Sequence, residues 1–154
     1  MHRPSHAIAL HGDEGSGLTE LSTYLRNSFT VGKPDAEAFI AIEPNDKGTI
    51  TIDAVRELAH RLKLHNSGDG ISIVTSIDHA EAMPTEAQNA LLKLLEEPPA
   101  GVLFVLLSYD ASKLLPTIRS RCVSIEVLPV SLEDAKTYFG TSSDEFIRTY
   151  RLSG

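Results

Sequence analysis

The sequence predicts an α/β fold built on a mostly parallel central sheet. Five short apolar runs alternate with segments of helical periodicity, an order typical of strand–helix–strand units. Most of the runs lack the strict alternation of a half-exposed strand, which favours strands covered on both faces. The runs are Ala7–Leu10, Ala38–Ile42, Ile71–Ile77, Val102–Leu107 and Cys122–Leu128.

Three segments between these runs predict helices, because their apolar residues recur three and four positions apart. We expect Thr51 to cap the second helix, and Thr85 to form a capping box with Gln88 at the start of the third. Gly32–Asp35 and Asn66–Gly70 predict surface loops. The helical segments are Leu18–Asn27, Ile52–Leu64 and Thr85–Leu95.

Composition excludes several classes of protein. The chain of 154 residues predicts one domain with room for a small second piece. A single cysteine, Cys122, leaves no disulfide within the chain and fits a reducing cytoplasm. The net charge of −7 argues against coating nucleic acid by bulk electrostatics. The apolar runs are too short to span a membrane, Met1–His6 is too short and polar for a signal peptide, and the histidines lack metal-ligand spacing.

A glycine-rich loop, GDEGSGLT at residues 12–19, follows the first run. Gly12, Gly17 and Thr19 fit the phosphate-loop pattern G-x-x-x-x-G-K-[ST], but Leu18 stands in place of the lysine. That lysine meets the charge of the β- and γ-phosphates, which leucine cannot do. The hypothesis is a degenerate nucleotide site, formed by these residues and Gly15, that binds ATP or ADP weakly or not at all. The alternative is a strand-to-helix turn without a ligand.

An acid, Asp78, ends the third apolar run. An aspartate in this place helps to hold Mg²⁺ in phosphate-loop ATPases, so Asp78 is assigned to the same degenerate site. The next residue, often a glutamate that activates water, is here His79. Leu18 and His79 are thus two independent departures from a working ATPase. The alternatives are that Asp78 caps the following turn, that His79 is an exposed loop residue, and that the chain is an active ATPase with an unusual loop.

Four blocks of the sequence resemble bacterial DNA polymerase III clamp-loader subunits, most of all the delta-prime type. They occur in the family's order and with its spacing. The helix block and the Ser-Arg-Cys block are the most specific of the four. The blocks are Thr51–Leu58, Asp78–Met83, Asn89–Pro99 and Leu114–Cys122.

The resemblance implies a P-loop NTPase fold of the AAA+ type, with a five-stranded parallel sheet and helices on both faces. Residues 1–130 would form this domain, and residues 131–154 would begin a helical lid, with expected helices at Ser131–Phe139 and Ser143–Arg151. The family's collar domain and four-cysteine zinc module have no counterpart in the sequence. The implied function is that of a non-catalytic subunit supporting sliding-clamp loading in DNA replication. Its implied partners are the gamma/tau and delta subunits and, through the complex, the clamp and primed DNA.

The resemblance also implies that Arg121 is an arginine finger, which reaches a γ-phosphate held by a neighbouring subunit. Arg119 is a second candidate for a partner contact, and Ser108 or Tyr109 stands where the family keeps a polar residue that senses the γ-phosphate. The alternative is that Arg119 and Arg121 are solvated charges, and that Ser108 or Tyr109 only ends a strand. A different class of function also stays open, namely a stand-alone interaction module of the same fold.

Overall fold

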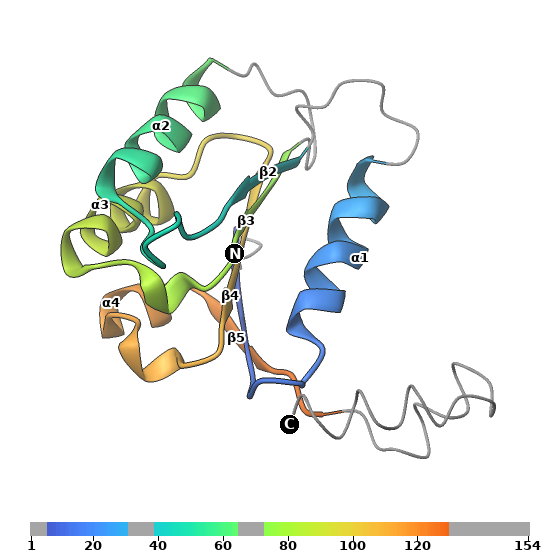
Figure 1. Cartoon of the computed structure of the whole chain (residues 1–154). Coiled ribbons are helices and arrows are strands. Elements are labelled where there is room, and N and C mark those ends of the chain that lie inside the picture. The colour runs from blue at the N-terminus through green and yellow to red at the C-terminus, as the bar shows by residue number, and fades with distance from the viewer. Residues whose placement is uncertain (1–5, 31–38, 65–72, 130–154) are drawn as a thin grey trace.

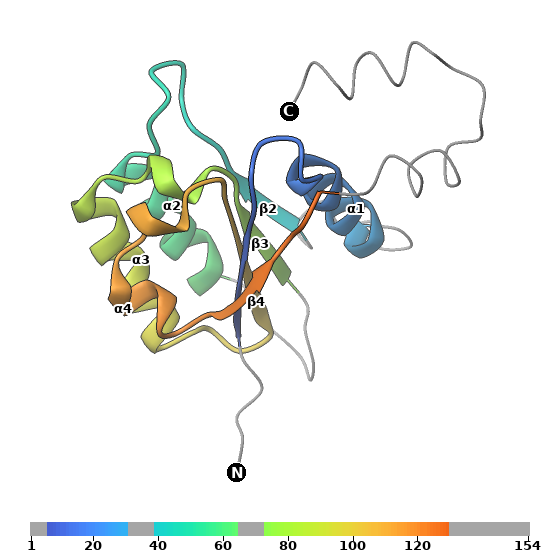
Figure 2. The same cartoon turned by 90° about the horizontal axis from the view of Figure 1, so that it is seen from below.

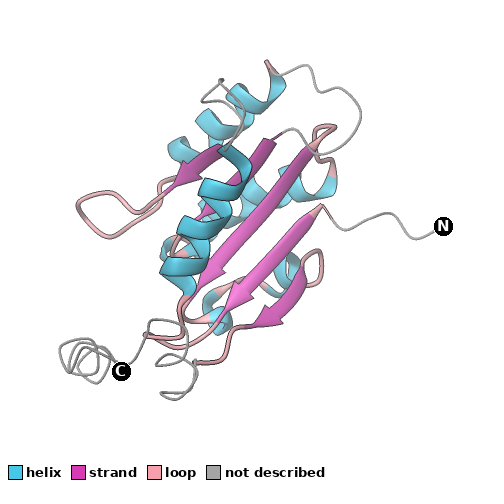
Figure 3. Cartoon of the chain, turned by 90° about the vertical axis from the view of Figure 1, so that its right-hand side faces the viewer, coloured by secondary structure: helices cyan, strands magenta, loops and turns pink. Residues whose placement is uncertain are grey.

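A computed structural model describes residues 6–30, 39–64 and 73–129. Its centre is a five-stranded sheet of order β2-β3-β4-β1-β5, in which every neighbouring pair is parallel. Figure 3 shows the strands running in one direction. The predicted parallel sheet is therefore confirmed. The strands are β1 (Ala7–His11), β2 (Phe39–Ile42), β3 (Ile73–Ile77), β4 (Val102–Ser108) and β5 (Val123–Glu126).

Helices cover both faces of the sheet, as expected. One face carries α1, and the other carries α2, α3 and α4 (Figures 1 and 2). This distribution of helices follows from the strand order. The chain crosses the sheet in one direction from β1 to β2 and in the other direction from β2 to β5, and right-handed connections made in opposite directions lie on opposite faces. The helices are α1 (Leu18–Thr30), α2 (Ile52–Lys63), α3 (Thr85–Glu96) and α4 (Pro116–Arg119), with 3₁₀ turns η2 (Ala80–Ala82) and η3 (Ala111–Lys113).

Two apolar cores lie on opposite faces of the sheet. The larger one includes Phe104 and Leu106 of β4, which pack with buried residues of α2 and α3. The smaller one lies toward α1 and consists of five buried residues, each less than a tenth exposed: Leu10, Leu18, Val74, Val105 and Leu107. Neighbouring residues of β4 serve different cores because successive side chains of a strand point to opposite faces.

The last strand departs from the prediction of strands covered on both faces. All four residues of β5 are exposed, and Val123 and Ile125 retain 47% and 44% of their accessible surface. The reason is position, because β5 is the edge strand beyond β1. The strand is also shorter than the predicted run, which began at Cys122 and ended at Leu128.

The two predicted helix caps have different outcomes. Thr51 caps α2 as expected, because its hydroxyl accepts a hydrogen bond from the Ala54 N–H at 3.2 Å. The capping box at α3 is wrong, because Pro84 is the N-cap and Thr85 already lies inside the helix. Gln88 is buried instead, and its amide bonds to the backbone of the segments around α3.

Other expectations fall on segments outside the described residues. These are the two helices and the lid within residues 131–154, and the loops at residues 32–35 and 66–70. In the part of the chain that is described, no helix is both long and apolar enough to cross a membrane.

Candidate nucleotide cleft and surface arginine

The carboxyl ends of β1, β3 and β4 bring the candidate site residues together. In a parallel sheet these ends share one edge, which is where ligands bind in folds of this type. The Gly12 N–H donates to the Ser108 carbonyl at 3.3 Å, so the phosphate loop begins beside the end of β4. The backbone of Asp78 is held beside the end of β2, because its N–H donates to the Ile42 carbonyl at 2.9 Å.

Backbone geometry explains the glycines of the phosphate loop. Gly15 and Gly17 have φ angles of 81° and 92°, a region that side chains with a Cβ rarely enter. Gly12 is needed for a different reason, because a Cβ there would meet the Val127 carbonyl oxygen at 2.3 Å. The loop therefore retains glycines where its backbone conformation requires them, although leucine replaces the lysine of a phosphate loop.

Leu18 is a core residue. It is only 1% exposed and packs in the smaller core against Leu10, Val105 and other apolar side chains. A leucine here stabilises the contact between α1 and the sheet and brings no positive charge to the loop. Thr19, the next residue, is exposed, and its hydroxyl lies 2.8 Å from the phenol oxygen of Tyr109.

Asp78 is held by two serines. The Ser22 hydroxyl lies 3.3 and 3.2 Å from the two carboxylate oxygens, and the Ser76 hydroxyl also donates to Asp78. The idea that Asp78 caps the next turn is wrong, because His79 is the N-cap of η2 and makes no side-chain capping bond. Sequence reasoning missed both serines, which carry no motif and meet Asp78 only through the fold.

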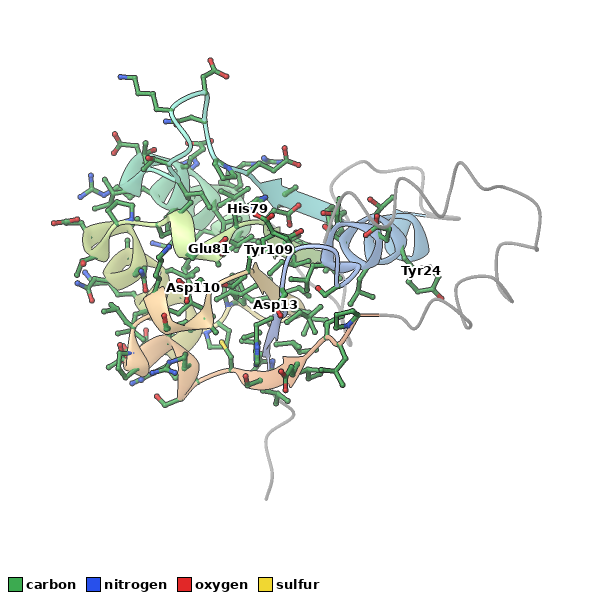
Figure 4. The ribbon with its side chains drawn as sticks, turned by 60° about the horizontal axis from the view of Figure 1, so that its bottom comes forward. Asp13, Tyr24, His79, Glu81, Tyr109 and Asp110 are labelled. Carbon is green, nitrogen blue, oxygen red and sulfur yellow. The ribbon has the colours of Figure 1, made fainter. Side chains whose placement is uncertain are left out.

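His79, Glu81 and Tyr109 form a second group at the same edge (Figure 4). His79 has a φ of 53°, and its Nδ1 lies 3.4 Å from a carboxylate oxygen of Glu81. Its ring packs against that of Tyr109 with centroids 4.9 Å apart. The other Glu81 oxygen accepts the Tyr109 N–H at 3.3 Å. His79 is exposed, as the interpretation of it as an exposed loop residue predicted. It also contacts Glu81 and Tyr109, which could not be inferred from the sequence.

The cleft between these groups has a volume of about 400 Å³. No lysine or arginine is among the described residues that line it, and Glu43 and Asp78 add two carboxylates. Buried Ser108, a candidate phosphate sensor, accepts a hydrogen bond from the Asp110 N–H at 3.3 Å. These side chains do not fit a magnesium-bound triphosphate, because no lysine or arginine among the described lining residues offsets its charge. Within the described ranges, no three acids, histidines or cysteines gather to hold a metal.

Arg121 lies just before the amino end of β5. Because the strands are parallel, this places it at the opposite end of the strands from the cleft. One of its guanidinium nitrogens is 2.6 Å from a carboxylate oxygen of Glu96, at the end of α3. Another donates to the Thr117 carbonyl at 3.0 Å, as does the Ser120 hydroxyl. Arg121 is therefore ordered at the surface, away from its own cleft. Sequence reasoning missed Glu96 as its partner.

Together, the strand order, the glycine-rich loop after β1 and the acid after β3 define a P-loop NTPase domain of the AAA+ type. A solved Thermotoga maritima protein described as DNA polymerase III gamma subunit-related has this fold, with a TM-score of 0.76 and 28% identity over 92% of this chain and 47% of its own. Thermotoga maritima RuvB, a Holliday junction branch migration motor, shares the fold with a TM-score of 0.55 at 14% identity over 77% of this chain and 37% of its own.

Sequence comparison identifies the family within this class of P-loop NTPase domains. The family model for DNA polymerase III, delta subunit, matches residues 1–131. The Escherichia coli DNA polymerase III subunit delta′ is 38% identical over 70% of this chain and 33% of its own length. The gamma/tau subunit of Mycobacterium tuberculosis is 31% identical over 77% of this chain and 24% of its own length. The chain therefore belongs to the DNA polymerase III clamp-loader subunit family, and it spans about a third of the length of the delta′ relative from E. coli.

Proposed function

We propose that this chain acts as a non-catalytic, delta′-like clamp-loader subunit, which supports sliding-clamp loading by donating Arg121 to a neighbouring ATPase. The observation that carries the proposal is the burial of Leu18. With this residue 1% exposed in the core, the phosphate loop offers no amine to a triphosphate. The chain would bind ATP or ADP weakly or not at all, and its contribution would come from its surface.

Arg121 is the surface residue best suited to act on a neighbour. A guanidinium presents several N–H donors in a planar fork, which suits the charge of a transferring phosphoryl group. Its side chain is 36% exposed and lies outside the cleft of its own chain. The resemblance of residues 114–122 to the family's Ser-Arg-Cys segment supports the same assignment.

The proposed partners are the gamma/tau and delta subunits, with the clamp and primed DNA reached through the complex. The likeness to both delta′ and gamma/tau relatives supports this set. We further propose that residues 1–130 form the nucleotide-binding-fold domain and that residues 131–154 begin a lid.

Reconstitution with gamma/tau and delta subunits tests the proposal. We expect the chain to co-purify with them and to raise their clamp- and DNA-dependent ATPase activity. Arg121→Ala should remove this stimulation, since an arginine supplied in trans is worth roughly 10³-fold or more at the site that it serves. Arg61→Ala is the control, because Arg61 is an exposed arginine of α2 to which no partner contact is assigned.

Three results would count against the proposal. Unchanged stimulation by the Arg121→Ala complex would reject the arginine finger. Failure of the chain to join the other subunits would favour a stand-alone interaction module. Brisk steady-state ATP hydrolysis by the purified chain would show an active ATPase, so this assay should accompany the reconstitution.

A further inference from the structure

Tyr109 borders two hollows at the carboxyl edge of the sheet. On one side it lines the cleft with Thr19 and Asp78. On the other it lines a smaller cavity of about 110 Å³ beside Gly12 and Glu126. Tyr109 thus lies between two hollows that residues of the phosphate loop also line.

Three contacts hold Tyr109 in this position, one from α1 and two from η2 with its N-cap residue. Its phenol oxygen lies 2.8 Å from the Thr19 hydroxyl of α1. Its ring packs on His79, with centroids 4.9 Å apart and planes inclined by 37°. Its N–H donates to Glu81 of η2 at 3.3 Å. Thr19 and His79 therefore hold the aromatic side chain and Glu81 holds its backbone, and Figure 4 shows His79, Glu81 and Tyr109 close together.

The contact with Thr19 has a specific chemical consequence. In a phosphate loop, the hydroxyl at this position is a ligand of the Mg²⁺ ion that accompanies the nucleotide. The Tyr109 phenol oxygen, 2.8 Å from this hydroxyl, takes one of the few positions around it where a second partner can lie. The tyrosine side chain also lines the cleft together with Thr19 and Asp78, the two residues beside which the ion would have to lie.

We propose that Tyr109 is a specificity-determining residue that excludes magnesium-bound nucleotide from the cleft, independently of Leu18. This inference rests on the proposed non-catalytic function and adds a second exclusion device to it. The two residues act on different parts of the ligand. Leu18 withholds the charge that phosphates require, and Tyr109 fills space beside Thr19 and Asp78, where the metal would have to lie. Restoring the lysine alone should therefore leave binding of Mg·ATP poor.

Calorimetry of the full chain with Mg·ATP and Mg·ADP tests the proposal. The variants are Leu18→Lys, Leu18→Lys with Tyr109→Ala, and Leu18→Lys with Tyr109→Phe. We expect the alanine double variant to bind at least about tenfold more tightly than Leu18→Lys alone. The phenylalanine double variant should fall between them, because it frees the Thr19 hydroxyl but keeps the ring. Equal affinities of Leu18→Lys and the alanine double variant would overturn the proposal, as would a folded double variant that does not bind.

A second measurement keeps the proposal testable if lysine at the buried position 18 prevents folding. Here Leu18 is retained, and Tyr109→Ala is titrated with Mg²⁺ and inorganic tripolyphosphate while the backbone amides of residues 12–19 are followed by NMR. We expect weak saturable shifts in this variant, because Leu18 still withholds the charge, and none in the wild type. Tyr24→Ala, which removes a tyrosine of α1 that is 67% exposed, is the matched control and should behave as wild type.

Identical titrations of Tyr109→Ala and wild type would reject the role of Tyr109. This failure is distinguishable from failure of the proposed function. The binding experiments use the isolated chain, whereas the arginine experiment measures ATPase activity of other subunits in the reconstituted complex.

Discussion

The guanidinium of Arg121 and the carboxylate of Glu96 form an ion pair with a nitrogen–oxygen distance of 2.6 Å. The pair joins the end of α3 to the turn before β5, across 25 positions of sequence. Both side chains are more than a third exposed, so solvent screens their attraction. The pair is therefore better suited to orient the arginine than to stabilise the fold.

Glu96→Gln tests this orienting role. We expect the free energy of unfolding to fall by less than about 1 kcal/mol, since exposed ion pairs contribute little. Stimulation of the partner ATPase should nevertheless drop several-fold, less than in Arg121→Ala, because a disordered guanidinium reaches a phosphate less often. Chemical denaturation and the reconstituted ATPase assay measure the two effects. Glu97→Gln is the control, and stimulation by Glu96→Gln equal to wild type would show that Glu96 does not position the arginine.

Gln88 is expected to be a main stabilising residue of the α3 region. Its Nε2 donates to the Met83 and Lys113 carbonyls, both at 3.0 Å, and its Oε1 accepts the Leu115 N–H at 2.7 Å. The side chain is only 4% exposed, so Gln88→Ala would leave these backbone groups without a buried partner.

We expect Gln88→Ala to lower the free energy of unfolding by about 3 kcal/mol, as measured by urea denaturation. The exposed neighbour Asn89 supplies the control, and Asn89→Ala should change stability by less than about 0.5 kcal/mol. A loss for Gln88→Ala no larger than that of the control would contradict the buried network.

The elements of the fold could be predicted wherever the local sequence pattern determines them. The predictions for Gln88 and β5 failed because both depend on contacts between segments distant in sequence. Apolar periodicity located the strands and the starts of α1, α2 and α3, because each element must bury one or both faces. Gln88 was misassigned because its three partners lie on segments brought to α3 by the fold. The exposure of β5 depends on strand order, which no single run of residues encodes.

The candidate site also combines residues that local pattern reveals with contacts that only the fold creates. The phosphate loop and Asp78 could be found from residue spacing, because each follows an apolar strand. The bond between Thr19 and Tyr109 spans 90 positions and needs β4 to lie beside β1 before it exists. Side-chain pairs of this kind depend on tertiary structure, and neither residue alone signals the other.

Cys122 gives a prediction about pH. Partial burial of the thiol disfavours its thiolate and raises the pKa from 9.0 to about 11. The thiol should therefore react slowly with iodoacetamide at neutral pH in the folded chain, and quickly once the chain is unfolded. The rate in the folded state should rise with pH up to about 11.

The same pKa shift makes folding stability depend on pH. Because the folded pKa lies above the unfolded value, the unfolded state loses its proton first as pH rises. Stability should therefore decrease between pH 9 and about 11. Cys122→Ala should remove this part of the decrease in denaturation experiments. An equal slope in wild type and variant over that range would show that the thiol does not contribute.

Thr75, in the middle of β3, is expected to be a site where a substitution stabilises the chain. It is fully buried at 0% exposure, and its hydroxyl has no hydrogen-bond partner. A buried hydroxyl without a partner is destabilising, because it has lost its bonds to water. Valine has nearly the same shape and keeps the preference for a strand, so Thr75→Val should raise the free energy of unfolding by about 1 kcal/mol.

The next residue provides a matched comparison for Thr75. Ser76 is also buried, at 2% exposure, but its hydroxyl donates to the Asp78 carboxylate. Ser76→Ala should therefore lower stability, since the partly buried carboxylate loses a donor. Thermal and urea denaturation of both variants would give changes of opposite sign. Replacing an unbonded buried hydroxyl by a methyl group of similar volume should only remove a desolvation cost. A loss of stability in Thr75→Val would therefore mean that the Thr75 hydroxyl has a hydrogen-bond partner in solution.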